Sequence, residues 1–349
     1  MKRILLTGGL GYIGSHTCLE FLNKYYKITI IDSLINSKID TVEKIEKIAE
    51  ENQNKSIENL NFEYGDIRDF EFLDNLFNSI YSKGNSFDGV VHFCGLKSVE
   101  ESVSNPLIYW DVNVAGTINL LKVMKKYGCY NLVFSSSATV YGNAKKFPIK
   151  ESFEINPVNT YGNTKAIIEK ILIDLKNEYS SNFNIAILRY FNPVGAHSSG
   201  LIGDSPVGEP NNIFPILNKI AASENKKFYI FGDDWPTRDG TCIRDFIHVM
   251  DLAEGHLLAL EFLKRNKNQI VIFNLGSGKG TTVLELVRTF QKVNNIYFPI
   301  SYGPKRKGDV AILIADINFA KDTLQWEPKR DITTMSKDSW NFFLKNNNI

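Results

Sequence analysis

The stretch Thr7-Gly8-Gly9-Leu10-Gly11-Tyr12-Ile13-Gly14 follows a short apolar run, residues 3–7, and precedes a segment of helical character, residues 13–25. Glycines at positions 8, 11 and 14 permit a tight turn, a close approach of the backbone to a pyrophosphate, and close packing of a helix on a strand. The N-terminus of the following helix then faces the phosphates. The stretch therefore predicts a dinucleotide-binding turn that opens a Rossmann-type domain.

Apolar runs and amphipathic segments alternate from this turn to residue 191. The strands expected are 3–7, 27–31, 61–64, 89–93, 132–135 and 185–190, and the helices are 13–25, 40–51, 70–82, 106–127 and 161–179. This alternation predicts an α/β fold with a doubly wound parallel sheet of six strands.

The rhythm changes in the turn-rich stretch 192–212. Beyond it we expect helices at 214–223, 252–263, 283–293 and 317–324 and a strand at 228–231. The chain is thus interpreted as a Rossmann domain over residues 1–191 and a smaller, mixed α/β substrate lobe over residues 192–349, with some chain crossing between them.

Composition excludes several classes of protein. The chain has 349 residues, 43% of them hydrophobic, and a formal net charge of +1. It is therefore too apolar for a disordered chain and has no overall charge that would attract nucleic acid or an anionic membrane. The apolar run before Gly8 is too short for a signal peptide, and the four cysteines show no metal-ligand spacing. We expect a cytoplasmic protein with reduced thiols, no bound metal, and no membrane or nucleic-acid partner.

Acidic residues end two of the predicted strands. The carboxylate of Asp32, after the second strand, is placed to bind both ribose hydroxyls and to repel a 2′-phosphate, which predicts NAD rather than NADP. Asp66, after the third strand, is expected near the adenine amino group. Gly95, after the fourth strand, allows a close approach to the middle of the cofactor.

The pattern Tyr-x-x-x-Lys occurs twice, at Tyr141/Lys145 and at Tyr161/Lys165. Glycine and proline interrupt any helix around the first pair. The second pair opens a strongly periodic helix, so its two side chains lie one turn apart on one face. We therefore predict that Tyr161 and Lys165 are catalytic.

A tyrosine, with an ordinary pKa near 10, is a poor base at neutral pH. A lysine charge about 4 Å away lowers that pKa by about three units at most. We accordingly expect Lys165 to bring the pKa of Tyr161 close to neutrality, with a positive nicotinamide acting in the same direction. Ser137 is the chosen third member, although the serines at 135–137 also suit a purely structural cap of the strand.

Five stretches together resemble the extended short-chain dehydrogenase/reductase family over nearly the whole chain. They are TGGLGYIGSHT (7–17), HFCGLK (92–97), FSSSATVYG (134–142), RYFNPVGAH (189–197) and RDFIHVMDL (244–252). The resemblance implies a triad of Ser137, Tyr161 and Lys165, with Lys165 also on the nicotinamide ribose. It implies NAD contacts from Gly8, Tyr12, Ile13, Asp32, Asn36, Asp66, Ile67, Phe93, Lys97 and Asn113, to which the glycine pattern adds Gly11, Gly14 and Gly95.

The same resemblance implies a UDP-sugar as the substrate, bound between the lobes. The resemblance implies that Asn192 binds the diphosphate and that Asn212, Tyr229 and Phe231 hold the uracil side. It implies that Arg244, Arg306 and Asp309 close on the phosphates and the ribose. The implied activity inverts C4 of the sugar through a transient 4-keto intermediate with tightly retained NAD. A homodimer through the helices at 106–127 and 161–179 is also implied.

Several alternatives remain open at this point. Related sugar-nucleotide dehydratases carry an acidic pair where this chain has Ala138-Thr139, so dehydration is disfavoured. The resemblance implies that Leu313 stands at the position that, in this family, limits room beside the sugar's C2 substituent. In the family, a large aromatic residue there excludes N-acetyl sugars and a small residue admits them, and leucine falls between the two in size. UDP-glucose and UDP-galactose are the expected substrates; the alternatives are an epimerase of N-acetylated or other nucleotide sugars and a catalytically silent, NAD-responsive binding protein.

Overall fold

The computed structural model describes residues 2–51, 59–178, 182–224, 226–306 and 309–347. The chain divides into two compact units. The first comprises Met1–Gly142, Glu154–Arg189 and Ala253–Phe273, and the second comprises Asn143–Phe153, Tyr190–Leu252 and Asn274–Ile349. Relative to a division after residue 191, residues 143–153 thus group with the second unit and residues 253–273 with the first.

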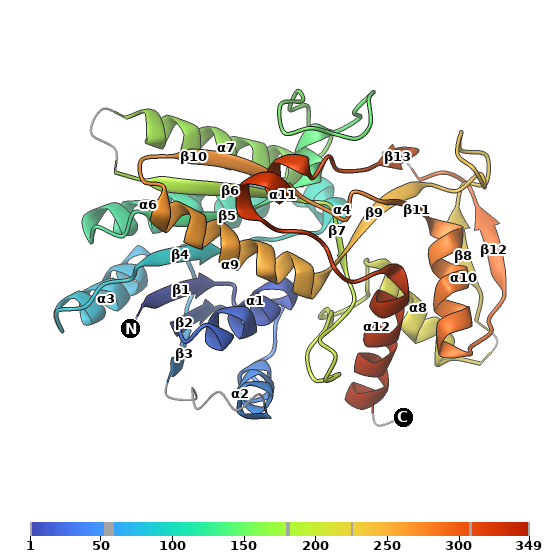
Figure 1. Ribbon diagram of the computed structural model, residues 1–349, viewed down its shortest axis with the longest axis horizontal. Coiled ribbons are helices and arrows are strands. Elements are labelled where there is room, and N and C mark those ends of the chain that lie inside the picture. Colours follow the sequence, from blue (N-terminus) through green and yellow to red (C-terminus); the bar gives the residue numbers. More distant parts are fainter. Residues whose placement is uncertain (1, 52–58, 179–181, 225, 307–308, 348–349) are drawn as a thin grey trace. The chain divides into compact units, whose positions relative to one another are not determined.

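The first unit is built on a seven-stranded sheet with the order β10-β6-β5-β4-β1-β2-β3 (Figure 1). Its strands are β1 (Arg3–Thr7), β2 (Lys27–Asp32), β3 (Leu60–Tyr64), β4 (Gly89–His92), β5 (Asn131–Ser137), β6 (Asn184–Tyr190) and β10 (Ile270–Leu275). The pairs β1–β2, β2–β3, β1–β4 and β4–β5 are parallel. The strand order reverses between β1 and β4, and this is the switch point at which open α/β sheets bind ligands.

The prediction of six strands was wrong by one, because β10 adds a seventh beside β6. Its sequence, IVIFNL, lies far along the chain, and nothing in so short an apolar run tells which strand it joins. Only contacts made in the folded chain, such as the bond from the Ile185 amide to the Gln269 carbonyl, place it there.

Helices cover both faces of this sheet. Their bounds are α1 (Tyr12–Asn23), α2 (Thr41–Glu51), α3 (Phe70–Tyr81), α4 (Val99–Ser104), α5 (Pro106–Tyr109), α6 (Gly116–Lys126), α7 (Thr160–Asn177) and α9 (Val249–Arg265). The apolar faces of α3, α6 and α7 pack with alternate strand residues such as Leu132 and Phe134 in one buried core. The expected single helix over 106–127 is instead interrupted by a π-helical turn, Trp110–Ala115.

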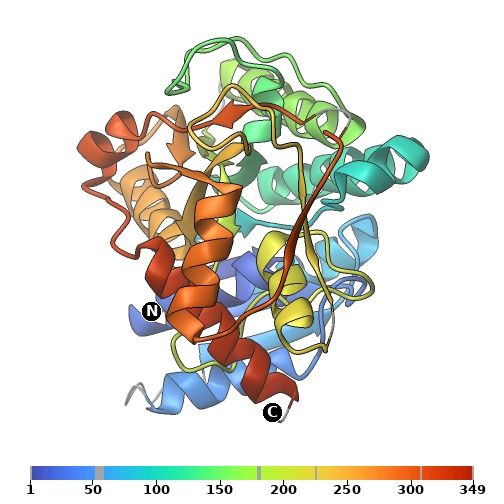
Figure 2. The same cartoon turned by 90° about the vertical axis from the view of Figure 1, so that its right-hand side faces the viewer.

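The second unit has a four-stranded sheet and a two-stranded one. In the first, β9 (Ile243–His248) pairs with β7 (Asn192–Val194), β11 (Gly280–Thr282) and β13 (Ile312–Leu313); in the second, β8 (Phe228–Phe231) pairs with β12 (Ile300–Gly303). Its helices are α8 (Ile213–Ala221), α10 (Val283–Asn294), α11 (Asn318–Leu324) and α12 (Ile332–Asn347). The orange α10 lies beside the red α12 in Figure 2, and both contribute to a core that includes Phe214, Phe290 and Met335.

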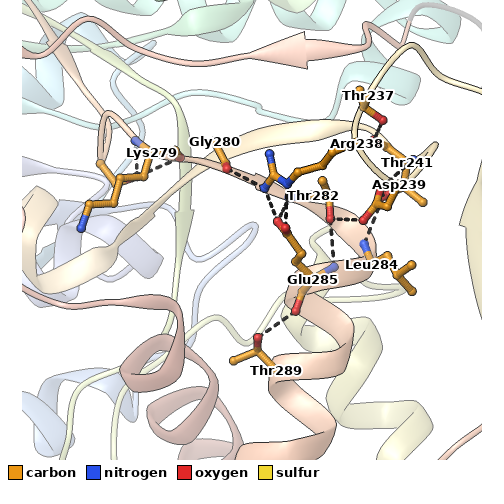
Figure 3. A network of polar contacts seen from close by, with 11 residues as sticks. Thr237, Arg238, Asp239, Thr241, Lys279, Gly280, Thr282, Leu284, Glu285 and Thr289 are labelled. Carbon is orange, nitrogen blue, oxygen red and sulfur yellow. Dashed lines mark hydrogen bonds and ion pairs between the residues drawn. The ribbon is translucent and has the colours of Figure 1, made fainter.

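A polar network fixes the turn that leads into β9 (Figure 3). Thr282 and Glu285 form a capping box at the start of α10. Arg238 forms an ion pair with Glu285, and Asp239 accepts hydrogen bonds from the backbone and hydroxyl of Thr241 at 2.9 and 2.8 Å. The hydroxyl of Thr282 donates to Asp239 as well. The start of β9 is therefore held against α10.

Within the described ranges, each helix is too short or too polar to span a lipid bilayer.

Candidate active site

The turn between β1 and α1 has no room for a side chain at two of its glycines. Gly8 has a φ of +70°, and a Cβ there would lie 2.8 Å from the backbone nitrogen of Cys94, in the loop after β4. A Cβ on Gly14 would lie 2.5 Å from the carbonyl oxygen of Gly8. Gly11 is the N-cap of α1 and supplies no side-chain acceptor, so the cap residue does not compete with an anion for the helix N–H groups. The half-buried residues Tyr12 and Ile13 open the helix.

Asp32 joins the end of β2 to the glycine turn. Its side chain is 7% exposed. One carboxylate oxygen accepts from the Leu10 amide at 3.1 Å, and the other accepts from the Leu34 amide at 3.0 Å and the Ser37 hydroxyl at 2.7 Å. These donors fix the carboxylate at the carboxyl edge of the sheet, where the sequence placed it. Asn36, in the same loop, is exposed.

Asp66 is held by its neighbour Arg68. Nε of the guanidinium contacts both carboxylate oxygens at 3.1 Å and a terminal nitrogen contacts one of them at 2.7 Å, and this pairing holds the pKa of Asp66 below its usual range. Arg68 also pairs with Asp111 at 2.8 Å. The side chain of Ile67 is buried, and a Cβ on Gly116 would lie 2.8 Å from it. Only the backbone of Ile67 is therefore available to a ligand at this edge.

A buried amide holds the loop after β4 against α7. Gly95 has a φ of +156°, and a Cβ there would lie 3.0 Å from Oδ1 of Asn113. That oxygen accepts from the Leu96 amide at 2.8 Å, while Nδ2 donates to the Leu96 carbonyl and to the Thr164 hydroxyl, each at 3.1 Å. Asn113 lies in the π-helical turn, a feature frequent at functional sites. Both amide hydrogens are thus used within the protein, so Asn113 orders the loop.

Cys94 marks the place where the predicted cofactor residues converge. Burial raises the pKa of its thiol, which also interacts electrostatically with Asp32, Asp66 and Lys165. The ends of β2 and β3 and the start of α7 therefore lie around one point. Of its neighbours in the loop, Phe93 has its ring 4.8 Å from that of His256, and Lys97 is exposed.

Ser137, Tyr161 and Lys165 come together as predicted. Ser137 ends β5, and its hydroxyl is hydrogen-bonded to the phenol of Tyr161. Tyr161 and Lys165 lie in the first turns of α7. The Lys165 ammonium donates to the carbonyl oxygen of Ser135 at 2.7 Å and lies 4.9 Å from the ring centroid of Phe134 and 5.9 Å from that of Tyr161.

The expected lowering of the Tyr161 pKa is wrong for the protein groups alone. Burial raises the pKa of Tyr161 to about 12, and the hydrogen bond to Ser137 opposes this only in part. Burial lowers the pKa of Lys165 to about 8, against the opposing effects of Cys94 and Glu169. The Lys165 ammonium donates its hydrogen bond to a strand carbonyl and not to the phenolic oxygen. Desolvation of the phenol therefore dominates the pKa of Tyr161.

As predicted, the first Tyr-x-x-x-Lys pair, Tyr141/Lys145, is not arranged on an α-helix. Tyr141 ends a short 3₁₀ turn, Ala138–Tyr141, and Gly142 follows with a φ of +56°. The Tyr141 ring is buried, and its hydroxyl accepts from Arg189 at 2.8 Å. Tyr141 is therefore part of the core of the first unit.

The second unit brings four of the predicted substrate residues together. One oxygen of Asp309 lies 3.0 Å from Nε of Arg306, and the other lies 3.5 Å from a guanidinium nitrogen of Arg244. Arg306 stacks over Phe231 at 4.8 Å, and Arg244 also donates to the Val310 carbonyl at 2.7 Å. Two guanidinium groups therefore meet at one carboxylate beside an exposed aromatic ring, an arrangement that suits a phosphate and a flat base.

The remaining substrate residues lie elsewhere in the second unit. Oδ1 of Asn192, on β7, is buried without a hydrogen-bond partner among the described residues. Asn212 precedes α8 and donates to Asp204 at 2.6 Å. Tyr229 is 55% exposed and shares the outward face of β8 with Phe231. Leu313 lies on β13 in register with Arg244 on β9.

Sequence reasoning overlooked Asp245, which directly follows Arg244. It is fully buried and accepts from the Ser277 hydroxyl at 2.7 Å and from the backbone amides of Gly278 and Ala315, each at 3.0 Å. The Ser277 amide donates to it too. Asp245 thus secures the glycine-rich turn that connects β10 to β11. Asp245 lies in the stretch RDFIHVMDL (244–252), and this position was the sequence signal that could have identified it.

A known protein family and its curated members match nearly the whole chain. The model of the family described as GDP-mannose 4,6 dehydratase matches residues 5–339. A curated relative from Arabidopsis thaliana, UDP-glucose 4-epimerase 2, is 44% identical over 345 residues, which are 99% of this chain and 96% of the relative.

Solved structures agree with this similarity. A UDP-glucose 4-epimerase from Stenotrophomonas maltophila, with bound NAD and formylated UDP-arabinopyranose, is 41% identical with a TM-score of 0.93 and covers 100% of this chain and 99% of its own. A UDP-glucose 4-epimerase from Bifidobacterium longum, in complex with NAD+ and UDP, is 40% identical with a TM-score of 0.91 and covers 99% of each chain.

Proposed function

We propose a function on one premise: this chain belongs to the family described as GDP-mannose 4,6 dehydratase and, within it, to the UDP-glucose 4-epimerases. The protein is an NAD-dependent isomerase that interconverts UDP-galactose and UDP-glucose, a step of galactose metabolism. The single observation that carries the proposal from family to chemistry is the meeting of Ser137 with Tyr161 beside the buried Lys165.

The first unit fits NAD. The glycine turn excludes every Cβ at Gly8 and Gly14, and Asp32 is held at the end of β2 by three donors. A carboxylate there accepts from ribose hydroxyls and repels a 2′-phosphate, which favours NAD over NADP. When bound, NAD supplies reversible oxidation and reduction at C4 of the sugar.

Tyr161 is the proposed acid and base at the sugar's 4-hydroxyl. Its phenolate oxygen takes the hydroxyl proton as a 4-keto sugar forms and returns a proton when C4 is reduced from the opposite face. Ser137 orients that oxygen through their hydrogen bond. Because burial raises the pKa of Tyr161 to about 12, the phenolate needs positive charge beyond that of Lys165, which an oxidised nicotinamide bound beside it would supply.

The second unit supplies the proposed tether for the UDP moiety. Arg244 and Arg306 bind phosphate oxygens, Asp309 binds ribose, and Asn192 offers an acceptor that has no partner within the described residues. A sugar held only through its diphosphate can present either face to the reacting groups. Ala138 and Thr139 are not acidic, so no residue there protonates a departing hydroxyl, and epimerisation is favoured over dehydration.

The test mixes purified protein with UDP-galactose, without added cofactor, and follows formation of UDP-glucose by chromatography. Conversion supports both the reaction and retained NAD. Tyr161→Phe should lower turnover by on the order of 100-fold or more while NAD stays bound. A 4-keto-6-deoxy product by NMR would identify a dehydratase instead, and NAD binding without conversion would favour the silent binding protein.

A homodimer is part of this proposal. Leu107 on α5 is 82% exposed, Val103 on α4 is 65% exposed and Ile167 on α7 is 43% exposed, and these helices contact one another in the first unit. Apolar side chains gathered on adjacent helices favour association. Leu107→Lys should shift the mass measured by light scattering from dimer to monomer, whereas Tyr297→Lys, at an 87% exposed position of the second unit, should not.

We also place the protein in the cytosol. Its four cysteines are free, and Cys18, Cys129 and Cys242 are buried, which is the state expected in a reducing compartment. Fractionation of cells that express a tagged chain tests this placement.

A further inference from the structure

Glu169 lies on the same face of α7 as the two proposed catalytic side chains. It follows Lys165 by one helical turn and Tyr161 by two. Its side chain is only 1% exposed. Burying a carboxylate costs free energy of desolvation unless both of its oxygens are paired. Both oxygens of Glu169 are paired.

The partners of Glu169 come from two strands. Its Oε1 accepts from the Ser136 hydroxyl on β5 at 2.5 Å and from Nε of Arg189 on β6 at 3.0 Å. Its Oε2 accepts from the terminal guanidinium nitrogen of Arg189 at 2.7 Å. The side chain of Arg189 is 2% exposed. One carboxylate thereby joins α7, β5 and β6 in the interior of the first unit.

The other end of Arg189 reaches the chain on the far side of Ser137. Its second terminal nitrogen donates to the hydroxyl of Tyr141 at 2.8 Å. Ser136 immediately precedes Ser137, and Tyr141 closes the 3₁₀ turn that follows it. The ion pair is therefore hydrogen-bonded to the chain on both sides of Ser137, to Ser136 through Glu169 and to Tyr141 through Arg189.

We propose that Glu169 and Arg189 are positioning residues for the reaction: their buried ion pair sets the place of Ser137 against Tyr161 and keeps a negative charge one turn from Lys165. This inference rests on the proposed function. It assigns neither residue a contact with substrate or cofactor. The pair acts through Ser136 and Tyr141 on one side and through the charge of Lys165 on the other.

The second part of the inference concerns the charge of Lys165. Several titratable or charged groups surround that ammonium: His92 and Cys94 from β4 and its loop, Tyr161 and Glu169 from α7, and Arg189 from β6 behind Glu169. Desolvation raises the pKa of the half-buried Cys94 thiol and lowers the pKa of the buried His92 to about 3, so both are neutral at pH 7. Glu169 is then the nearby anion that keeps Lys165 protonated.

The experiment uses the full-length protein with its retained NAD and separates the two parts. Ser136→Ala and Tyr141→Phe each remove one hydrogen bond from one side of Ser137. Each should lower kcat by roughly 10-fold or more with KM for UDP-galactose unchanged, because the loss is in the placement of reacting groups. The matched control is Asp174→Asn, which breaks the exposed pair with Lys170 on the same helix and should leave kcat as it is.

Glu169→Gln tests the charge. The pKa of Lys165, read by NMR titration of its Cε signal, should fall by about one unit or more because a neighbouring anion is lost and the positive charge of Arg189 is no longer balanced by Glu169. If this variant does not fold, Glu169→Met/Arg189→Met fills the volume without an unpaired charge. That double variant should show a smaller fall in the lysine pKa, because the positive charge of Arg189 is removed as well, and a lower kcat.

The inference is overturned if Ser136→Ala and Tyr141→Phe both keep kcat within about twofold of wild type. It is equally overturned if the Lys165 titration is unchanged in the Glu169 variants. A wild-type protein without epimerase activity would refute the proposed function instead, and the Lys165 titration would still test the effect of Glu169.

Discussion

The ammonium nitrogen of Lys165 donates to the backbone oxygen of Ser135 at 2.7 Å, so the lysine is anchored to the end of β5. It stands 5.9 Å from the centre of the Tyr161 ring. This geometry keeps a positive charge inside the first unit at a fixed distance from the proposed base. The charge is costly to bury, because a lysine side chain at 3% exposure has lost nearly all of its water.

That cost predicts a gain in stability from an inactivating substitution. Burial lowers the pKa of Lys165 from 10.5 to about 8. Between these pH values the unfolded chain binds more protons than the native one, so this residue's contribution to stability rises with pH and is least favourable below pH 8. Lys165→Met should therefore raise the free energy of unfolding at pH 7, by roughly 3 kcal/mol at most, and should abolish epimerisation.

Urea unfolding at pH 7, 8.5 and 10 measures this effect against wild type. The difference between the two proteins should shrink as pH rises. Lys170→Met, at a side chain 65% exposed, serves as the control and should show a small difference independent of pH. A Lys165→Met protein less stable than wild type at pH 7 would show that the bond to Ser135 outweighs desolvation.

Gly8→Ala should release NAD, because a Cβ at this position meets the Cys94 nitrogen at 2.8 Å. Gly128 provides a matched control: its φ is +69°, close to the +70° of Gly8, but a Cβ there meets its nearest neighbour, Tyr130, at 3.9 Å. Both alanine variants pay about 1–2 kcal/mol for the left-handed backbone. The NAD released on acid denaturation should be near stoichiometric in Gly128→Ala and largely absent in Gly8→Ala.

Asp32→Asn should weaken the binding of NAD and reduce the discrimination against NADP. The amide has no charge to repel a 2′-phosphate, and its Nδ2 faces donors from Leu10 or from Leu34 and Ser37. Loss of a charge-assisted hydrogen bond predicts roughly 10- to 100-fold weaker NAD binding. Calorimetry on cofactor-stripped protein measures both dinucleotides. Asp40→Asn, an exposed carboxylate further along the same loop, should change neither affinity.

The features that sequence predicted well are local ones. A glycine pattern indicates where the backbone can turn tightly or approach a ligand closely, because glycine has no Cβ. A four-residue spacing on a helix indicates which side chains share a face. Both predictions follow from backbone geometry alone. The turn at Gly8 and the pair Tyr161 and Lys165 are of this kind. The six strands expected in the first half of the chain are also found, because their apolar runs alternate with long amphipathic helices.

The features that sequence missed depend on distance in space. Glu169 and Arg189 stand on different elements, and no periodicity states that their side chains meet. The direction of the pKa change at Tyr161 depends on which group the Lys165 ammonium contacts, and it contacts the Ser135 carbonyl. A spacing of four residues does not determine that contact. Asp245 was missed for the same reason, since its partners Ser277 and Ala315 come from distant segments.

Asp245→Asn should destabilise the second unit. The carboxylate is fully buried and faces only donors, from Ser277, Gly278 and Ala315. The NH₂ group of an asparagine would face at least one of these donors, and neither that donor nor the NH₂ group would then have a hydrogen-bond acceptor. Thermal and urea unfolding should show a loss of about 2–4 kcal/mol. Asp322→Asn, at an exposed position of α11, is expected to be neutral, and an equal effect of the two substitutions would contradict this account.

Leu313 is predicted to set the preference between UDP-sugars. It lies in register with Arg244, beside the cluster proposed to bind the diphosphate, so its side chain can limit the room near the sugar. Leu313→Ala should raise kcat/KM for UDP-N-acetylglucosamine relative to UDP-glucose by about 10-fold, the scale expected when a few methylene groups are removed from a pocket. Leu313→Tyr should lower that ratio. Ile312→Ala is the control, because adjacent residues of a strand point to opposite faces. If wild type already prefers the acetylated sugar, or if both alanine variants change the ratio equally, Leu313 does not control the choice.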